Sequence, residues 1–305
     1  MKQDDHAPAL TGSTLFTGIF GDPVEHSQSP AMHNAAYAAL GLERAYLAFH
    51  VKPENLRNAI DALAALGILG VNLTVPHKEA ALPMMVTVSE EARILGAVNC
   101  VINRPGGPHG DNTDARGLEG DLRRLVHLDG QSAIVIGAGG AAASAILACI
   151  RMGTRQIVVC NRTVARAEAM VRRFTHDVMT PSGHAAQCSL QAQGLDALLD
   201  PQVLGAAAII LNATPMGLKT GAFAPLSYES TPANCFFYDL VYAAKPTPFI
   251  AGAAAFGRRT ADGAGMLINQ GELAFELFNQ VPAPSGVMRA ALMKRLGRPE
   301  FVNMR

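Results

Sequence analysis

The chain carries few charges and no excess of either sign. Only 16% of its 305 residues are charged, and 25 Lys and Arg balance 25 Asp and Glu. A protein whose main partner is nucleic acid or an acidic membrane surface carries a clustered excess of basic side chains. The balance therefore predicts neither a nucleic acid nor a membrane as partner, and leaves a small molecule as the expected ligand.

Cysteine is sparse and unpaired in the sequence. The five residues are Cys100, Cys149, Cys160, Cys188 and Cys235, an odd number with no C-x-x-C pair among them. A disulfide framework or a zinc site needs regular cysteine spacing, which this chain lacks. We expect reduced thiols and a cytoplasmic protein.

Three further patterns are missing. The first dozen residues lack the basic and apolar blocks of a signal peptide, and we interpret residues 1–11 as a flexible tail. His26, His33 and His77 lack the spacing of metal ligands, so we expect structural or rim roles and no metal; the alternative for His77, beside Lys78, is a catalytic role. No G-x-S-x-G nucleophile elbow occurs, which argues against an acyl-transfer hydrolase.

The most informative stretch is present at residues 132–152, SAIVIGAGGAAASAILACIRM. Its first apolar run is typical of a buried parallel strand, its glycines of a tight turn, and its alanine-rich remainder of a helix. Gly137 suits the turn, Gly139 a close approach to a ligand, and Ala142 close packing of helix on strand. Free amides at a helix start bind pyrophosphate. This order predicts a dinucleotide site, and the alternative is an alanine-rich core helix capped by glycines.

The next strand, residues 156–160, indicates which dinucleotide. An NAD site places Asp or Glu about 20 residues past the glycines, to bind the ribose hydroxyls. This chain has Asn161, Arg162 and Thr163 there, followed by Arg166. Two guanidinium groups suit a 2′-phosphate, so the pattern favours NADP. The alternative is solvated arginines on a surface helix that Thr163 caps.

The order of apolar runs and turns predicts two lobes. Residues 15–75 alternate strand and helix in the order β-α-β-α-β, which predicts a mainly parallel sheet. In that lobe we expect strands at 15–20, 44–51, 70–75 and 97–103, a turn at 106–108, and a helix from Pro30 capped by Ser29. Later strands near Ile134, Ile157, 207–211 and 236–241 alternate with helices. Residues 176–195 show no assignable pattern.

The fold class we expect is α/β with two lobes. An N-terminal, mainly parallel α/β substrate domain precedes a Rossmann-type, doubly wound NADP-binding domain. Helices at 266–278 and 287–296 have no strand left to alternate with, so we expect them to return to the first lobe. The domains would be 12–113 with 266–305, and 114–265.

Residues for chemistry should lie at the carboxyl ends of the strands. Lys78 follows the strand that Pro76 stops, and Asp114 lies at the boundary between the lobes. We expect this pair to take part in proton transfer. The alternative for Lys78 is a solvated surface group. Polar residues beside the strand ends suit substrate hydroxyls or backbone groups in turns: Asn72, Thr74, Asn99, Asn112 and Thr113. Ser27 and Ser29 suit a carboxylate, or serve only as caps.

Seven blocks of sequence resemble those of the shikimate dehydrogenase family, in family order. They are GDPVEHSQSPAMHN (21–34), VNLTVPHKE (71–79), GAVN (96–99), DNTD (111–114), NATPMG (212–217), DLVY (239–242) and GMLINQ (265–270). The resemblance implies NADP-dependent, reversible reduction of 3-dehydroshikimate to shikimate, on the way to chorismate and the aromatic amino acids. It leaves open whether the protein is a monomer or a homodimer.

The resemblance also implies roles for individual residues. Lys78 would pass the proton, with Asp114 orienting it; Ser27 and Ser29, helped by Tyr242, would hold the substrate carboxylate. The ring hydroxyls would contact Thr74, Lys78, Asn99, Asp114 and Gln270. NADP would contact Gly137, Ala138, Gly139, Gly140, Ala141, Ala142, Asn161, Arg162, Thr163, Arg166, Thr214, Met216, Val241, Gly263 and Met266.

Two alternatives stay open at this point. One is a quinate/shikimate dehydrogenase paralogue with broader substrate use or with NAD, since Ser144 stands where many family members place an arginine. The other is a non-catalytic NADP-binding regulator, against which the presence of both Lys78 and Asp114 argues.

Overall fold

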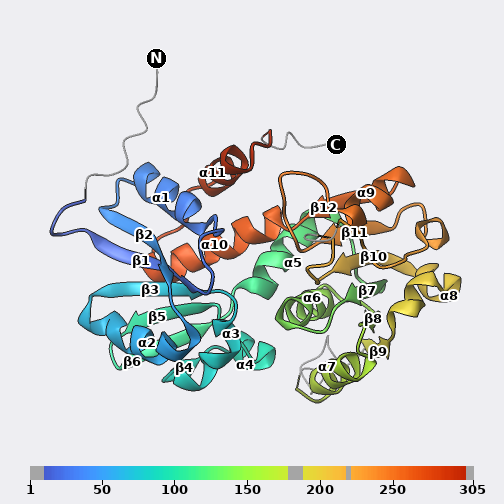
Figure 1. Ribbon diagram of the computed structural model, residues 1–305, viewed down its shortest axis with the longest axis horizontal. Coiled ribbons are helices and arrows are strands. Elements are labelled where there is room, and N and C mark those ends of the chain that lie inside the picture. The colour runs from blue at the N-terminus through green and yellow to red at the C-terminus, as the bar shows by residue number, and fades with distance from the viewer. Residues whose placement is uncertain (1–9, 178–187, 218–220, 300–305) are drawn as a thin grey trace. The chain divides into compact units, whose positions relative to one another are not determined.

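The computed structural model describes residues 10–177, 188–217 and 221–299, and the chain divides into two compact units. The first unit comprises Met1–Thr113 with Gln270–Arg305, and the second comprises Asp114–Asn269 (Figure 1). Most of the expected tail, and residues 178–187 of the stretch without a pattern, lie outside the described residues. The rest of that stretch contains strand β9 (Ser189–Gln193).

The first unit is built on a six-stranded sheet, with strand order β2-β1-β3-β5-β6-β4 among the described residues. Its strands are β1 (Leu15–Gly21), β2 (Arg44–His50), β3 (Ile68–Leu73), β4 (Thr87–Val88), β5 (Cys100–Arg104) and β6 (Gly107–Asp111). Its helices are α1 (Ser29–Ala39), α2 (Leu56–Ala65), α3 (His77–Ala80), α4 (Glu90–Leu95) and α11 (Val287–Leu296), with the second half of α10 (Ala264–Asn279).

The turn expected at 106–108 lies one residue earlier, at Pro105 and Gly106, and is shorter, because Gly107 and Pro108 already belong to β6. β5 pairs antiparallel with β3 and with β6, and Arg104 faces Gly107 across the hairpin. Only Pro105 and Gly106 lie between them, and Gly106 adopts a φ of +95°. A Pro-Gly pair closes such a two-residue turn because glycine tolerates the positive φ. The remaining pairs of this sheet, β1 with β2, β1 with β3 and β4 with β6, are parallel.

The expected cap of α1 is also corrected. The helix begins at Ser29 itself, with Gln28 at the N-cap position and no side-chain cap. The side chain of Ser27 takes part of that role, because its oxygen accepts a hydrogen bond from the Ser29 amide at 3.3 Å. Pro30 lies in the first turn, where its missing N–H costs nothing.

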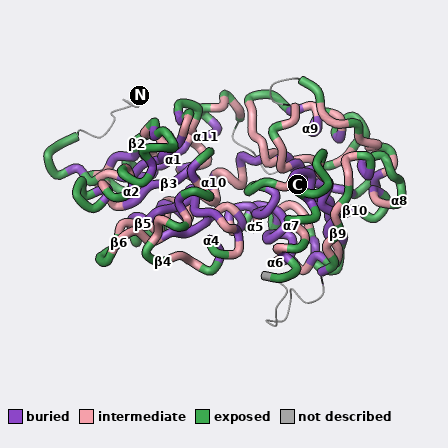
Figure 2. The backbone as a smooth tube through the Cα atoms, turned by 60° about the horizontal axis from the view of Figure 1, so that its bottom comes forward, coloured by how far each residue is buried: buried purple, intermediate pink, exposed green. Residues whose placement is uncertain are grey.

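Both faces of the first sheet are covered. Leu56, Ile60 and Leu63 of α2 pack on one face, in a cluster that includes Val71 and Val101. On the other face α1 meets α10, where the rings of Tyr37 and Phe275 lie 5.2 Å apart. Figure 2 shows the buried residues concentrated in the strands. Leu56, Ile60 and Leu63 stand at helical intervals and form the apolar face of α2 that covers the sheet.

The second unit has a six-stranded, wholly parallel sheet in the order β12-β11-β10-β7-β8-β9 among the described residues. Its remaining strands are β7 (Ser132–Ile136), β8 (Gln156–Cys160), β10 (Ala207–Asn212), β11 (Phe236–Asp239) and β12 (Arg259–Asp262). Its helices are α5 (Asp114–Leu125), α6 (Gly140–Arg151), α7 (Val164–Asp177), α8 (Pro201–Leu204) and α9 (Pro248–Ala255), with the first part of α10.

This strand order confirms the expected doubly wound fold. Relabelled from β7, the order is 3-2-1-4-5-6, and the direction of winding reverses between β7 and β10. Ile134, Ile210 and Phe237 of three neighbouring strands belong to one buried cluster with Phe249 of α9, whose ring lies 5.4 Å from that of Phe237. Ligands of such sheets bind beyond the carboxyl ends of the strands at this reversal.

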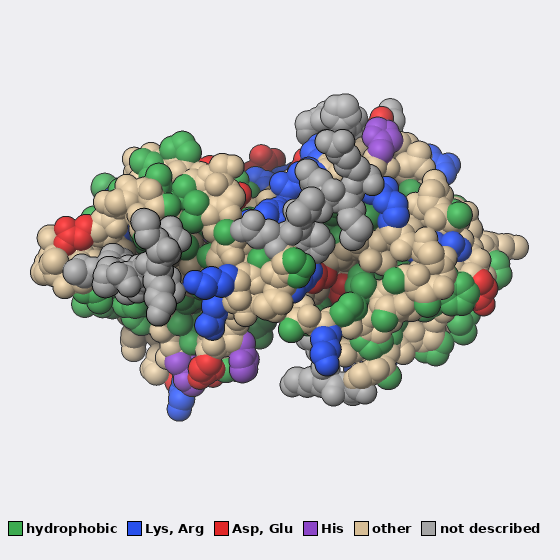
Figure 3. Space-filling view, turned by 90° about the horizontal axis from the view of Figure 1, so that it is seen from above, with side chains coloured by type: hydrophobic (Ala, Val, Ile, Leu, Met, Phe, Trp, Pro, Cys, Tyr) green, Lys and Arg blue, Asp and Glu red, His purple; other side chains and the backbone are tan. Residues whose placement is uncertain are grey.

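The second crossing between the units falls inside helix α10, four residues later than the expected 266. The first turns of α10 belong to the second unit because Asn269 Nδ2 donates a hydrogen bond to the carbonyl of Gly117 on α5, at 3.0 Å. No helix among the described residues is long and apolar enough to cross a membrane. On the face shown in Figure 3, basic and acidic side chains are interspersed.

Candidate active site

Polar side chains in the first unit gather where β1 and β3 end. The amide of Thr74 donates to the carbonyl of Phe20 at 3.0 Å, so the chain beyond β3 stays beside the end of β1. The Thr74 side chain is half-buried and packs close to Gly21. A Cβ at position 21 would lie 2.5 Å from the Thr74 methyl group. This close approach needs glycine there and aligns Thr74 with the loop that leads to α1.

The two serines expected to hold a carboxylate differ in burial. Ser29 is 6% exposed and Ser27 is half-buried. The Ser29 side chain hydrogen-bonds to Tyr46, whose hydroxyl donates to Asn72 Oδ1 at 2.8 Å. Burial raises the pKa of Tyr46, so its hydroxyl stays a neutral donor. A tyrosine in an apolar strand gives no local sign of this role, and sequence reasoning missed it.

His33 is a core residue, as expected. Its ring stacks on Tyr46 with centroids 4.1 Å apart, and burial lowers its pKa to about 3. Neither ring nitrogen has a hydrogen-bond partner. His77 is also buried, with Nε2 2.7 Å from the carbonyl of Val51. Both histidines therefore contribute packing to this end of the first unit.

Lys78 and Asn99 are brought together through the backbone. The amide of Val98 donates to the carbonyl of Lys78 at 2.8 Å, so α3 lies beside the segment that carries Asn99. Asn99 is 2% exposed, and its Oδ1 accepts from the Thr113 amide at 2.8 Å. The Thr113 hydroxyl donates to the carbonyl of Gln270 at 3.2 Å. Four sequence-distant segments therefore converge at one end of the first sheet.

Asp114 and Tyr242 belong to the second unit. Asp114 follows Thr113 directly and is the first residue of α5, and its side chain is half-buried. Tyr242 lies in the loop after β11, where burial raises its pKa. The pairing of Lys78 with Asp114, and the approach of Tyr242 to the serines, stay predictions.

The glycine turn of the second unit has the expected backbone. Gly137 adopts a φ of +121°, and a Cβ there would lie 3.0 Å from the carbonyl oxygen of Ala213, just past β10. Gly139 and Gly140 have open space in front of them, and no side chain caps the start of α6. Ala142 is fully buried. The turn thus offers helix amides and free room at the reversal point, which fits a pyrophosphate.

The end of β8 carries the residues that distinguish the cofactors. Arg162 and Arg166 are exposed, and Asn161 Nδ2 donates to the carbonyl of Thr163 at 2.9 Å, which shapes the turn. The strand ends at Cys160 with no carboxylate in the turn that follows. The donor set therefore fits a 2′-phosphate, which guanidinium groups bind through charge-assisted hydrogen bonds.

A buried carboxylate joins the loops that follow β10 and β11. Asp239 Oδ1 accepts from Asn212 Nδ2 at 2.9 Å and from the Val241 amide at 3.2 Å, and Oδ2 accepts from the Thr247 hydroxyl at 2.5 Å. Asn212 in turn accepts from the Thr214 hydroxyl at 2.6 Å. Burial raises the pKa of Asp239 to about 6, against the opposing effect of these donors.

Sequence reasoning missed this network although it named Thr214, Met216 and Val241. The Met216 amide donates to Thr214 Oγ1 at 3.3 Å, so both residues depend on Asn212. The signal available was a polar residue closing each of two adjacent apolar strands. The Gly263 amide donates to the carbonyl of Val241 at 3.2 Å, which draws the start of α10 to the same loop. Met266, in the first turns of α10, is half-buried.

Among the described residues no group of three or more His, Cys, Asp or Glu side chains could hold a metal ion.

Three family models match successive parts of the chain. The shikimate dehydrogenase substrate binding domain matches residues 19–101, the shikimate/quinate 5-dehydrogenase model residues 121–188, and the shikimate 5-dehydrogenase C-terminal domain residues 263–293. The first match begins within β1 and ends within β5, and the second covers the glycine turn. The models therefore fall on both units.

Individual relatives agree. The shikimate dehydrogenase (NADP(+)) of Citrifermentans bemidjiense is 40% identical over 95% of this chain and 98% of its own length. Shikimate 5-dehydrogenase from Thermus thermophilus, solved with NADP(H) and shikimate, is 37% identical, with a TM-score of 0.79 over 92% of this chain and 99% of that one. Quinate dehydrogenase from Corynebacterium glutamicum, solved with NAD, is 29% identical, with a TM-score of 0.81 over 92% and 99%. The chain belongs to the shikimate dehydrogenase family.

Proposed function

We propose that this chain catalyses the reversible, NADP-dependent reduction of 3-dehydroshikimate to shikimate, a step toward chorismate and the aromatic amino acids. The observation that carries the proposal is the combination, in a chain of this family, of a pyrophosphate turn followed by two arginines with a polar cluster containing Lys78. The pyrophosphate turn with its two arginines selects NADP. The polar cluster offers Lys78 as a proton carrier among groups that bind hydroxyls and a carboxylate.

NADP would lie on Gly137 to Ala142, with its 2′-phosphate toward Arg162 and Arg166. When bound, this cofactor supplies the hydride that reduces the substrate carbonyl, or accepts it in the reverse direction. The Asp239 network holds the loops of Thr214, Met216 and Val241 in one arrangement before the cofactor arrives. Such preorganisation lowers the entropy that binding has to remove.

Lys78 carries the proton in this proposal. Its ammonium gives a proton to the carbonyl oxygen as the carbonyl carbon is reduced, and the resulting amine takes a proton from the hydroxyl in the oxidation. Asp114 accepts a hydrogen bond from the ammonium and aims it. Asp114 follows Thr113, which is bound to Asn99 beside the Lys78 backbone, and this supports the pairing.

The substrate carboxylate would bind to the hydroxyls of Ser27 and Ser29, with help from Tyr242. In the structure the Ser29 hydroxyl donates to Tyr46, whose own hydroxyl donates to Asn72, so Ser29 would turn its proton from Tyr46 to the carboxylate when the substrate binds. Thr74, Asn99 and Gln270 would bind the ring hydroxyls. Groups set by packing and by hydrogen bonds of this kind keep a substrate aligned for reaction.

The test is steady-state oxidation of shikimate with NADP by wild type and by Lys78→Ala. Loss of the proton carrier should lower kcat by about 10² to 10⁴-fold, with NADP binding retained. The control is Lys52→Ala, because Lys52 is an exposed lysine of the same unit that precedes a short helix, and it should keep the wild-type rate. Undiminished turnover in Lys78→Ala would contradict the assignment.

The same assay separates the two alternative functions. A paralogue specialised for quinate would show the larger kcat/KM with quinate, or with NAD in place of NADP. A regulator without activity would bind NADP in calorimetry and reduce none of it with either polyol. The exposed Arg162 and Arg166 and the absence of a carboxylate after β8 favour NADP.

A further inference from the structure

The chain passes between the two units twice, and a polar joint on the second unit binds the two crossing segments together. One crossing lies between Thr113 and Asp114 at the start of α5, and the other between Asn269 and Gln270 within α10. Asp114 and Gln270, both expected to contact substrate, are the first residues after these two crossings.

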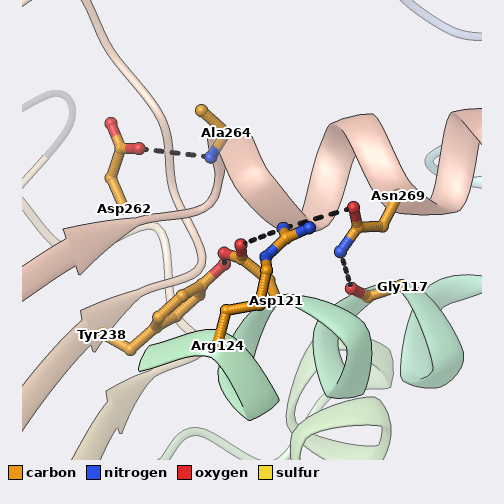
Figure 4. Close-up of polar contacts among 7 residues, drawn as sticks. All are labelled: Gly117, Asp121, Arg124, Tyr238, Asp262, Ala264 and Asn269. Atoms are coloured by element: carbon orange, nitrogen blue, oxygen red, sulfur yellow. Dashed lines mark hydrogen bonds and ion pairs between the residues drawn. The ribbon is translucent and has the colours of Figure 1, made fainter. Parts of the chain in front are cut away.

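Asn269 is the residue that joins the two helices on the second unit. Its Nδ2 donates to the carbonyl of Gly117 at 3.0 Å, and its Oδ1 accepts from Arg124 Nη2 at 3.4 Å (Figure 4). Gly117 lies in the first turn of α5, three residues after Asp114. The side chain also lies over Gly120, where a Cβ would be 3.2 Å from Nδ2. The helices therefore approach closely at glycines.

A buried carboxylate anchors this joint to the sheet. Asp121, 7% exposed, accepts from the Tyr238 hydroxyl at 2.8 Å on one oxygen and from Arg124 Nη2 at 2.8 Å on the other (Figure 4). Any Cβ at Gly265 would overlap these oxygens, so the first turn of α10 rests directly on the carboxylate. Arg124 thus connects Asp121 to Asn269, and the first part of α10 is fixed to α5 and β11 together.

A second hydrogen bond joins the same two segments within the first unit, at Thr113 and Gln270. The Thr113 hydroxyl donates to the carbonyl of Gln270 at 3.2 Å, and Thr113 is itself held by Asn99. The segment Thr113 to Gly117 and the pair Asn269 and Gln270 are therefore bound together on both sides of the crossings. Gln270 therefore directly follows a residue whose side chain is held on the second unit, and its own carbonyl is held by Thr113 on the first unit.

We propose that Asn269 is a positioning residue, which sets Gln270 for the substrate by tying α10 to the first turn of α5. This inference rests on the proposed function. Asn269 contacts the carbonyl of Gly117 and Arg124 and acts only through the backbone of its neighbour. A misplacement of about 1 Å away from the chemistry can cost up to about 10²-fold in rate.

The test is a double-mutant cycle read by kcat/KM for shikimate. Asn269→Ala should lower this value about tenfold or more, with KM for NADP within about twofold of wild type. In a Gln270→Ala background the same substitution should cost less than about threefold, because the residue that it positions is already gone. A purely structural role would give the same cost in both backgrounds.

The matched control is Asn279→Ala. Asn279 lies on the same helix, is buried, and its Nδ2 donates to the carbonyl of Phe275. Its hydrogen bonds among the described residues stay within the first unit. Its loss should lower the melting temperature and leave kcat/KM within about twofold of wild type. Asn269→Asp is the second variant, should Asn269→Ala fail to fold. This variant keeps the shape of the side chain but removes the Nδ2 donor, because a carboxylate oxygen then faces the Gly117 carbonyl.

The outcomes are distinct. Equal costs of Asn269→Ala in the two backgrounds, or an equal loss of kcat/KM in Asn279→Ala, would overturn the positioning role in an otherwise active enzyme. A wild-type chain that leaves NADP unreduced with shikimate would overturn the proposed function, and this inference with it.

Discussion

Replacing Asp239 with asparagine should change how stability depends on pH. The side chain is fully buried, and burial raises its pKa from an ordinary 3.8 to about 6. A carboxyl whose pKa is higher in the folded state favours folding while it is protonated. That contribution is complete below about pH 3.8 and is lost as pH rises through about 6, in the direction opposite to that of a salt-bridged carboxylate.

The size of the effect follows from the two pKa values. The difference between 3.8 and about 6 corresponds to about 3 kcal/mol between acid and neutral pH. Asp239→Asn cannot ionise and keeps the shape, so Oδ1 can still accept from Asn212 and from the Val241 amide. Its amide nitrogen would face Thr247, whose hydroxyl would then have to accept. Any change in hydrogen bonding is present at every pH, and only the ionisation varies.

The measurement is urea unfolding of both proteins by far-UV circular dichroism at several pH values. The transition of the second unit is identified as the one that NADP moves to higher urea, since a ligand stabilises the unit that binds it. The stability of wild type relative to Asp239→Asn should fall by about 2 kcal/mol from about pH 4 to about pH 7.5, because part of the ~3 kcal/mol is already lost at about pH 4. A difference that stays constant over this range, or that rises with pH, would refute the reasoning.

Two further predictions concern single contacts. Arg162→Ala should lower kcat/KM for NADP about tenfold or more and leave the value for NAD within about twofold, because a charge-assisted bond to the 2′-phosphate is lost. Arg172→Ala is the control, because this exposed arginine lies on α7, the helix that follows Arg162, and pairs with Glu168; it should change neither value. Equal losses with both cofactors in Arg162→Ala would count against the 2′-phosphate site. Gly265→Ala should lower the free energy of unfolding by about 1–3 kcal/mol, because its Cβ would overlap the Asp121 carboxylate. Gly12→Ala is the control: nothing lies near this glycine, so the free energy of unfolding should stay within about 0.5 kcal/mol of wild type. Wild-type stability in Gly265→Ala would show that α5 and α10 can separate at no cost.

Several local features were predictable from the sequence. The strand, glycine turn and helix from Ser132 to Arg151 follow from β-branched residues, a glycine that takes positive φ, and alanines. The doubly wound sheet follows from the alternation of apolar strands with helices, because parallel strands need such crossovers. Arg162 and Arg166 indicated the cofactor in the same way, since the spacing from the glycines is set within one βαβ unit.

Other features were missed because neighbouring residues do not encode them. The β5–β6 hairpin was taken for a turn, since the run Gly107 to Asp111 has little of the apolar pattern of a strand. Strand β6 forms because β5 pairs with one of its edges and β4 with the other. The crossing in α10 falls at Gln270 because Asn269 binds α5, a partner more than a hundred residues away.

The sequence by itself determined most of the elements, the family and the identity of the candidate side chains, because these depend on local backbone preferences and on residue chemistry at fixed spacing. Only the tertiary structure decided which groups support them: Tyr46 behind Ser29, Asp239 between two loops, and Asp121 beneath α10. Each is a polar residue that burial forces to find a partner, and the partner is chosen by how the chain packs.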